Sequence, residues 1–394
     1  MLILVCWSEI MSNIMDIIAE KTNGKSYKTF KYCFDNYSVP SFNYDDHAEI
    51  TWSKYGETAP PMTSEAQNMK PLADKIISEK PLFTYFLDGS RHTYKVDDIA
   101  YNNQVYPVIA GQIGISCCSR INRNMQKHAL KNKLVVALPQ CACSDTWKRE
   151  VSFNNIKTAI NNNATRLKKI NIQITDVLSY STKKDEFEKI ENKGIAAIQD
   201  LMIDQEIEMV TELVKEGLLD QDNYLLKDGS LEYRIDNIAN ARERRRFQSN
   251  FRNVVGVSKS FNPENCKDKK GKNNSNLIAN LPLYHRTPVS FYTSPRLEGM
   301  AYAVWYLRIR DKKYTTNTFD GILKIEKIIV TDEEKEHYLD TEEVNLISAN
   351  LVNERNPVCY GADSRWANHL YPVYITERYA KSRYLSTEMF LNLF

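Results

Sequence analysis

The sequence predicts a mixed α/β protein, and two observations support this prediction. Strand-like apolar runs come early in the chain, and later strands alternate with helical segments, an order typical of a mixed sheet covered by helices. In addition, one tripeptide occurs twice, as Asp88-Gly89-Ser90 and Asp228-Gly229-Ser230, and each copy follows a short apolar run. We therefore expect two aspartates at strand ends, each followed by a glycine that allows a sharp turn.

The first half of the chain begins with helical and irregular segments and continues with strands. Residues 9–21 and 64–79 predict helices, and a polar stretch with Pro60 and Pro61 lies between them. The strands expected next are 82–88, 93–100, 105–118 and 133–139. Three strands in succession predict a meander that carries Asp88 on its first strand.

The second half predicts strands that alternate with helices. The helices are expected at 154–219, 235–248 and 377–394, and the strands at 224–228, 253–257, 301–310 and 321–330. The lysine- and asparagine-rich stretch 266–276 predicts a mobile loop. We expect an N-terminal extension over residues 1–80 and one domain over residues 81–394, with a helical insertion at 154–219.

Length and composition indicate a globular protein without a strong electrostatic field. The 394 residues are 42% hydrophobic and 26% charged, and the net charge is +2, so any nucleic acid would have to be held by local patches. The eight cysteines include no Cys-x-x-Cys pair, which favours buried thiols in a reducing cytoplasm over zinc or disulfides. The apolar start, residues 1–7, is too short for a membrane span. We expect a cytoplasmic protein with no membrane association.

Several catalytic motifs are missing from the sequence. The chain has no Gly-x-x-x-x-Gly-Lys-Ser/Thr phosphate loop, no Gly-x-Ser-x-Gly elbow and no His-Glu-x-x-His metal motif. These absences leave the carboxylates as the principal candidates for chemistry.

Asp88 and Asp228 are the first candidate metal ligands, because carboxylates at neighbouring strand ends can share a divalent cation. Each copy alone would be better explained as a hairpin turn, since Asp-Gly is a common turn signal. A third candidate is Glu206, which falls within the apolar stripe of its helix, whereas Glu208 does not. A carboxylate on a buried face needs a partner or a cation, although Glu206 at the stripe edge could also reach solvent.

The basic candidates are a lysine and a group of arginines. Lys259 follows a Val/Gly-rich strand, where it can touch a phosphate or be an ordinary solvated strand end. The arginine-rich segment can grip a phosphate backbone or form a solvated helix face. Its residues are Arg244, Arg245, Arg246 and Arg252.

In the order and setting of these motifs, the chain resembles the NurA family of nucleases. The shared pieces are Leu87-Asp88-Gly89-Ser90, Tyr106-Pro107, Glu206 on an acidic helix, Leu226-Lys-Asp228-Gly-Ser-Leu231, Val254-Val-Gly-Val-Ser-Lys259 and Tyr371-Pro372. They span most of residues 80–394, and each motif is short. The resemblance implies a ribonuclease H-like fold and manganese- or magnesium-dependent cleavage of DNA by exo- and endonuclease action. It further implies a dimer or higher oligomer docked on a HerA-type hexameric ATPase.

By position, the resemblance implies that Asp88, Glu206 and Asp228 bind the metal. We count Lys259 with the catalytic residues because a lysine after this strand can touch the scissile region. The family's last ligand is a His or Asp shortly after Tyr-Pro, where this chain offers only Glu377. That departure leaves the fourth ligand open, and with it an inactive relative that acts as a nucleic-acid or motor-docking clamp. An RNA nuclease is a third possibility. A divergent branch of the family suggests a role in anti-phage or anti-plasmid defence, or in DNA end processing.

Overall fold

The computed structural model describes residues 13–36, 51–59, 66–143, 152–183, 189–233, 241–268, 270–294, 300–358 and 366–394. Predictions for residues 1–12, Pro60 and Pro61 lie outside these ranges. The described strands are β1 Lys25–Tyr27, β2 Tyr32–Cys33, β3 Thr51–Tyr55, β4 Gln67–Asn68, β5 Phe83–Tyr101, β6 Gln104–Ile121, β7 Asn124–Pro139, β8 Asp176–Tyr180, β9 Tyr224–Asp228, β10 Val254–Ser258, β11 His285–Arg286, β12 Ser290–Thr293, β13 Ala301–Arg308 and β14 Ile322–Ile328. The described helices are α1 Ile14–Thr22, α2 Lys70–Ile76, α3 Phe153–Asn163, α4 Thr165–Lys169, α5 Ile190–Lys215, α6 Ala241–Asn250, α7 Ser275–Ala279, α8 Asp332–His337, α9 Thr341–Glu354, α10 Tyr371–Ala380 and α11 Thr387–Leu391.

One mixed sheet organises the chain, in the order β3-β12-β13-β14-β10-β9-β5-β6-β7-β8. The long strands β5, β6 and β7 form an antiparallel meander. On the other side of β5, β9 and then β10 run parallel to it, and β14 runs antiparallel to β10. This confirms the predicted mixed α/β sheet.

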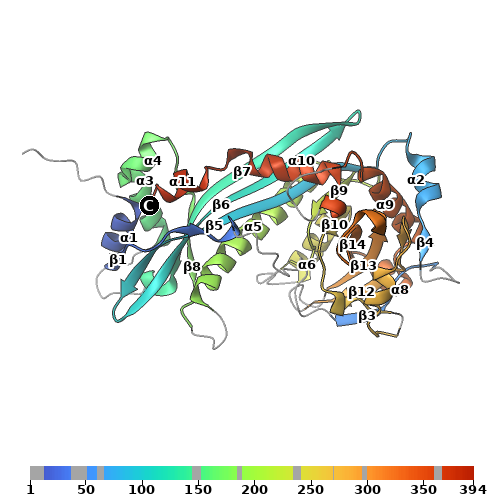
Figure 1. Cartoon of the computed structure of the whole chain (residues 1–394), viewed down its shortest axis with the longest axis horizontal. Helices are drawn as coiled ribbons and strands as arrows, with labels where there is room; N and C mark the ends of the chain where they lie inside the picture. Colours follow the sequence, from blue (N-terminus) through green and yellow to red (C-terminus); the bar gives the residue numbers. More distant parts are fainter. Residues whose placement is uncertain are drawn as a thin grey trace, which may run out of the picture.

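Helices cover both faces of the long strands (Figure 1). A Cβ added at Gly111 of β6 would meet Ile198 of α5, whereas one added at Gly114 would meet Ala380 of α10. Residues 111 and 114 point to opposite faces because side chains alternate along a strand. Helices α5 and α10 therefore lie on opposite faces of the meander.

The first Asp-Gly-Ser does not end a strand, so this prediction was wrong. The predicted strands 82–88 and 93–100 are parts of the single strand β5, and within it Gly89 pairs with Ile115 of β6. Pairing with β6 along nearly all of β5 outweighs the local turn preference of Asp-Gly. The second copy does end β9, and there Gly229 has a φ of +84°, which glycine adopts at little cost.

Other element boundaries also differ from the predictions. The expected helical region 154–219 contains the strand β8, which pairs in parallel with β7. The expected C-terminal helix 377–394 is two helices, α10 and α11, separated by Lys381–Arg383 and the residues after it. Glu377 consequently lies near the end of α10 rather than at a helix start. No described helix has the combination of length and apolar character that a bilayer crossing requires.

The described part of the N-terminal 80 residues adds strands to the sheet instead of packing separately. Strands β1 and β2 pair with β5, β3 pairs with β12, and β4 pairs with β11. The division of the chain at residue 80 remains a prediction. Three hydrophobic clusters form the core: one between the sheet and α5, one beneath α9, and one at the end that carries α1, α3 and α11.

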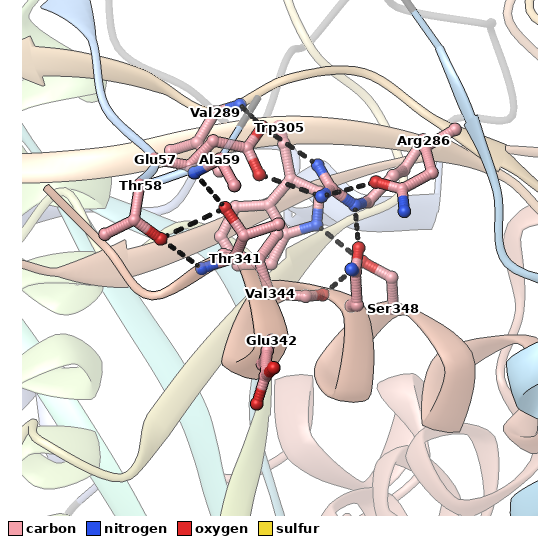
Figure 2. Close-up of polar contacts among 12 residues, drawn as sticks. Glu57, Thr58, Ala59, Arg286, Val289, Trp305, Thr341, Glu342, Val344 and Ser348 are labelled. Carbon is pink, nitrogen blue, oxygen red and sulfur yellow. Dashed lines mark hydrogen bonds and ion pairs between the residues drawn. The ribbon is translucent and has the colours of Figure 1, made fainter. Parts of the chain in front are cut away.

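A fully buried ion pair fastens the segment between β3 and β4 to the sheet. Figure 2 shows Glu57 facing Arg286, with both side chains 0% exposed and an Nη2–Oε2 distance of 2.8 Å. Arg286 also donates to Asn345 Oδ1 at 2.8 Å and to Gln67 Oε1 at 3.0 Å. A buried charge of this kind is tolerated only while it is fully paired.

Glu57→Ala should lower the free energy of unfolding by about 3–5 kcal/mol, because it leaves the Arg286 guanidinium buried without its counter-ion. Asp74→Ala breaks the half-exposed Lys70–Asp74 pair and should cost no more than about 1 kcal/mol. Urea unfolding of both variants tests the comparison, and equal losses would contradict it.

Candidate metal centre

Three acidic side chains from separate elements meet at one point. Asp88 comes from β5, Asp228 ends β9, and Glu377 comes from α10. Strands β5 and β9 are parallel neighbours in which Leu87 pairs with Lys227, so the aspartates that follow these two residues are also side by side. One carboxylate oxygen from each acid lies within 4.8 Å of the other two.

Lys259, just beyond β10, places its ammonium between two of these acids. Its Nζ lies 2.8 Å from Asp228 Oδ2 and 3.4 Å from Glu377 Oε2. Burial lowers the pKa of this lysine, but Asp228, Glu377 and Asp88 raise it more. Lys259 therefore stays charged and offsets part of the negative charge of the cluster.

The carboxyls respond in opposite ways to this environment. Burial and the nearby Asp228 carboxylate raise the pKa of Asp88 well above its ordinary value, and Lys259 only partly opposes them. Burial also acts to raise the pKa of Glu377, but Lys259 and Lys381 outweigh it and lower that pKa to about 2. Asp88 is thus the acid whose ionisation is costly when only Lys259 and Lys381 balance the cluster.

Glu206 approaches the same point from the opposite face of the sheet. Its side chain is buried, its Oε2 lies 3.1 Å from Lys227 Nζ, and it hydrogen-bonds the backbone of Gly89. Burial raises the pKa of Glu206, and Lys227 opposes that rise. Helical phase thus distinguishes Glu206 from Glu208, which is half exposed and pairs with Lys131.

Gly89 is the position at which the two faces meet. A Cβ there would lie 2.3 Å from Glu206 Oε1, so any side chain at this position would displace the carboxylate. Because Asp88 directly precedes Gly89 on the strand, its side chain points to the other face. The sheet consequently holds the Glu206–Lys227 pair beside the three-acid cluster without including Glu206 in it.

The three-acid cluster fits a hard divalent cation. Asp88 is 5% exposed, and its Oδ2 is buried without a hydrogen-bond partner among the described residues. Carboxylate oxygens are the ligands that Mg²⁺ and Mn²⁺ prefer, and an unsatisfied buried carboxylate oxygen is costly unless a cation binds it. Asp88, Asp228 and Glu377 would hold the ion. Among the described residues, no cysteine or histidine joins a comparable group.

A cavity of about 430 Å³ opens onto Asp88 and Asp228. Its lining includes two residues that the sequence interpretation missed, Arg91 of β5 and Tyr233. Lys381, also missed, donates to Glu377 Oε1 at 2.7 Å. The spacing of four residues between Glu377 and Lys381 within the expected helix 377–394 was a usable signal, whereas nothing local to Arg91 or Tyr233 predicts their place.

The predicted nucleic-acid arginines lie on or just after α6, next to this cavity. Phe247 of α6 packs edge-on against Tyr233 with ring centres 6.3 Å apart. The apolar face of α6 is thereby fixed against the cavity wall. Three of these arginines, Arg245, Arg246 and Arg252, are exposed, and Arg244 is partly buried. Their contact with nucleic acid remains a prediction.

The two serines of the repeated tripeptide have different environments. Ser230 Oγ donates to Glu326 Oε2 at 2.8 Å, and the Leu231 backbone donates to the same oxygen at 2.6 Å. This buried glutamate fixes the turn after Asp228. In the first copy, the Ser90 carbonyl accepts from the Tyr384 hydroxyl at 2.7 Å.

Gly89→Ala should destabilise the fold by about 1–3 kcal/mol, the usual cost of overpacking, because the added methyl displaces Glu206. Ser90→Ala, one residue further on and facing the other side, is the matched control and should have a smaller effect. Adding Glu206→Ala should rescue part of the Gly89→Ala loss. Strictly additive losses in denaturant unfolding would contradict this account.

Asp88→Asn should raise the melting temperature at neutral pH without metal, because the raised pKa of Asp88 means that its ionisation opposes folding. The gain should shrink as pH falls from the raised pKa of Asp88 toward the ordinary pKa of an aspartate, and it should be absent below that value, since both proteins are then neutral at that position. Glu377→Gln should do the opposite: its pKa of about 2 stabilises the fold above the unfolded-state value, and that stabilisation is lost as pH falls toward 2. Melting curves recorded between about pH 2 and pH 8 test the direction of the change in melting temperature for both variants.

Comparisons with known proteins give a distant likeness among solved structures. No family model matches the chain, and no curated protein is significantly similar to it. Among solved structures, the NurA nuclease from Sulfolobus solfataricus aligns over 87% of this chain and 84% of its own length, with 11% sequence identity and a TM-score of 0.41. At this sequence identity and TM-score, the likeness assigns no chemistry to this chain.

Proposed function

We propose that this chain is a divalent-metal-dependent nuclease. The observation that carries the proposal is the convergence of Asp88, Asp228 and Glu377, in which a buried oxygen of Asp88 lacks a hydrogen-bond partner among the described residues. Carboxylates converging on one point of a ribonuclease H-like sheet, with a charged lysine and a cavity beside them, suit hydrolysis of a phosphodiester.

Each residue has a role that follows from its place. The three acids would hold the cation, with Glu377 in the position that the sequence left open. Lys259, bonded to Asp228 and Glu377, would supply a positive charge beside the phosphate. The Glu206–Lys227 pair supports the strand beneath the cluster. Mn²⁺ or Mg²⁺ bound by the acids would lower the pKa of water and neutralise charge that builds on the phosphate.

The finer assignments rest on the motif order in the sequence. From the NurA-like order we propose DNA as substrate, exo- and endonuclease action, and assembly as a dimer or higher oligomer with a HerA-type hexameric ATPase. A cytoplasmic role in defence against phage or plasmid DNA, or in DNA end processing, belongs to the same proposal. The lack of a phosphate-loop motif agrees with a motor on a separate chain.

One observation favours the alternative of a non-catalytic relative. Lys259 already bonds two of the three acids, and a permanent lysine counter-ion would stabilise the cluster without a metal. Such a protein would bind nucleic acid or the ATPase as a clamp. The two functions make opposite predictions about cleavage by the wild type.

Asp88→Asn and Asp228→Asn should each reduce cleavage to background while folding and DNA binding persist, because an amide keeps the shape of the side chain but is a weaker ligand for a hard cation. The assay compares single- and double-stranded DNA and RNA with Mn²⁺, Mg²⁺ or EDTA, with and without the candidate ATPase. Glu208→Gln, on the exposed face of α5, is the matched control and should cleave normally.

Two outcomes of this assay would contradict the proposal. Full cleavage by both aspartate variants would remove Asp88 and Asp228 from the mechanism. A wild type that cleaves under none of these conditions would establish the non-catalytic alternative.

A further inference from the structure

A second cavity, of about 520 Å³, lies apart from the acidic cluster. Its size falls within the range of small-molecule sites. Three aromatic and three cationic side chains dominate its lining, and we call it the aromatic pocket. They are Tyr284, Tyr314, Trp366, Arg310, Lys313 and Arg355.

The charges of the aromatic pocket are mainly positive. Asp311 is the single acid in its lining, and its Oδ2 lies 3.5 Å from Lys313 Nζ. Arg310 is only 8% exposed and donates to the Arg355 carbonyl. A buried arginine carries its charge into the wall of the pocket, where an anion would meet less competition from water.

The aromatic rings combine with these cations. The Arg355 guanidinium carbon lies 4.8 Å from the centre of the Tyr284 ring, and Lys313 Nζ lies 4.8 Å from that of Tyr314. The Tyr314 side chain is 64% exposed, so its ring is available for stacking. Rings beside cations are the combination that proteins use for a base and its phosphate.

The backbone at Tyr284 is strained in a way that functional sites often are. Its φ is +62°, a left-handed conformation that is uncommon for a bulky residue. Two hydrogen bonds hold it there: Tyr284 N donates to the Arg308 carbonyl at 2.8 Å, and Met69 N donates to the Tyr284 carbonyl at 2.8 Å. Strain that neighbouring elements maintain is a recognised feature of ligand sites.

The aromatic pocket and the acidic cluster lie at the same end of the sheet. Arg308, at the end of β13, pairs with Ile322 at the start of β14, and β14 is the neighbour of β10, which ends just before Lys259. One side chain joins the two sites. Asn368 donates to the Lys259 carbonyl at 2.6 Å and accepts from Gly321 N at 2.6 Å, and Gly321 is in contact with Arg310.

We propose that the aromatic pocket binds one nucleotide of the DNA strand whose phosphodiester lies at the acidic cluster. The base stacks on the rings, and Lys313 and Arg355 hold the flanking phosphate. This inference rests on the proposed nuclease function. It adds a substrate-binding subsite that fixes how far the strand extends along this edge of the sheet.

The test measures binding of a fluorescein-labelled dT10 strand by anisotropy in EDTA, so that no cleavage occurs. Tyr314→Ala should raise the Kd about 5-fold or more, the loss expected for one stacked base. The logarithm of the association constant falls linearly as the logarithm of the salt concentration rises. Lys313→Ala should make this slope less steep by roughly 0.7, the value for one phosphate contact with a single strand. Both residues are largely exposed, so the variants should fold, and melting curves check this.

The chain offers a matched control at its other end. Lys25 Nζ lies 5.0 Å from the centre of the Tyr27 ring, a similar pair on β1 at the far end of the molecule from β13 (Figure 1). Lys25→Ala and Tyr27→Ala should leave dT10 binding unchanged. Equal effects of the two pairs, or no effect of Tyr314→Ala, would overturn the proposal.

Free nucleotide is the remaining competitor for the aromatic pocket. Unlabelled dTMP should displace dT10 only weakly, because the strand gains contacts at both sites. If dTMP fills the pocket and dT10 still binds with unchanged affinity, the pocket serves a free nucleotide and the proposal is wrong.

Cleavage with Mn²⁺ is scored separately. If Tyr314→Ala loses dT10 binding and no protein cleaves, the pocket proposal stands and the nuclease proposal fails. If Tyr314→Ala binds dT10 normally and the wild type cleaves, the nuclease proposal stands and the pocket proposal fails.

Discussion

The constraint on which the site depends is the crowding of Asp88, Asp228 and Glu377 around one lysine. Three carboxylates at this distance repel one another, and the Lys259 ammonium bonds only two of them. Asn368, buried, bonds the Lys259 carbonyl and the Ile322 carbonyl, at 2.6 and 3.0 Å. Asn368 thus fixes the backbone at Lys259 and at Ile322. Lys381 also bonds Glu377, so the charge of Asp88 remains to be balanced, by a proton or by a further cation.

The sheet places the charged side chains of the site on two opposite faces. Alternation along β5 and β9 sends Asp88 and Asp228 to the face of α10, and it sends Lys227 to the face of α5, where Glu206 meets it. Gly89 has no side chain on the α5 face, and the Glu206 carboxylate occupies the space that a side chain would fill. The buried Glu206–Lys227 pair therefore lies against the strand that carries Asp88, which helps to hold that strand in place.

Much of the sheet and the two aspartates could be predicted from the sequence, because apolar runs and helical phase are local signals. Phase alone favoured Glu206 over Glu208 as the acid on the buried face of α5. The sequence could not show that β5 continues through Asp88-Gly89-Ser90, since this depends on pairing with β6. Nor could it show that Glu377 joins the aspartates while Glu206 pairs with Lys227, because strand alternation and the docking of α10 decide that together.

The most direct test of the central claim is an anomalous diffraction map from crystals of the protein soaked in manganese. Our account predicts one strong manganese peak bonded to oxygens of Asp88, Asp228 and Glu377, with the Lys259 ammonium moved away from Asp228 and Glu377. A map without a peak at these acids, in which Lys259 keeps both ion pairs, would contradict it.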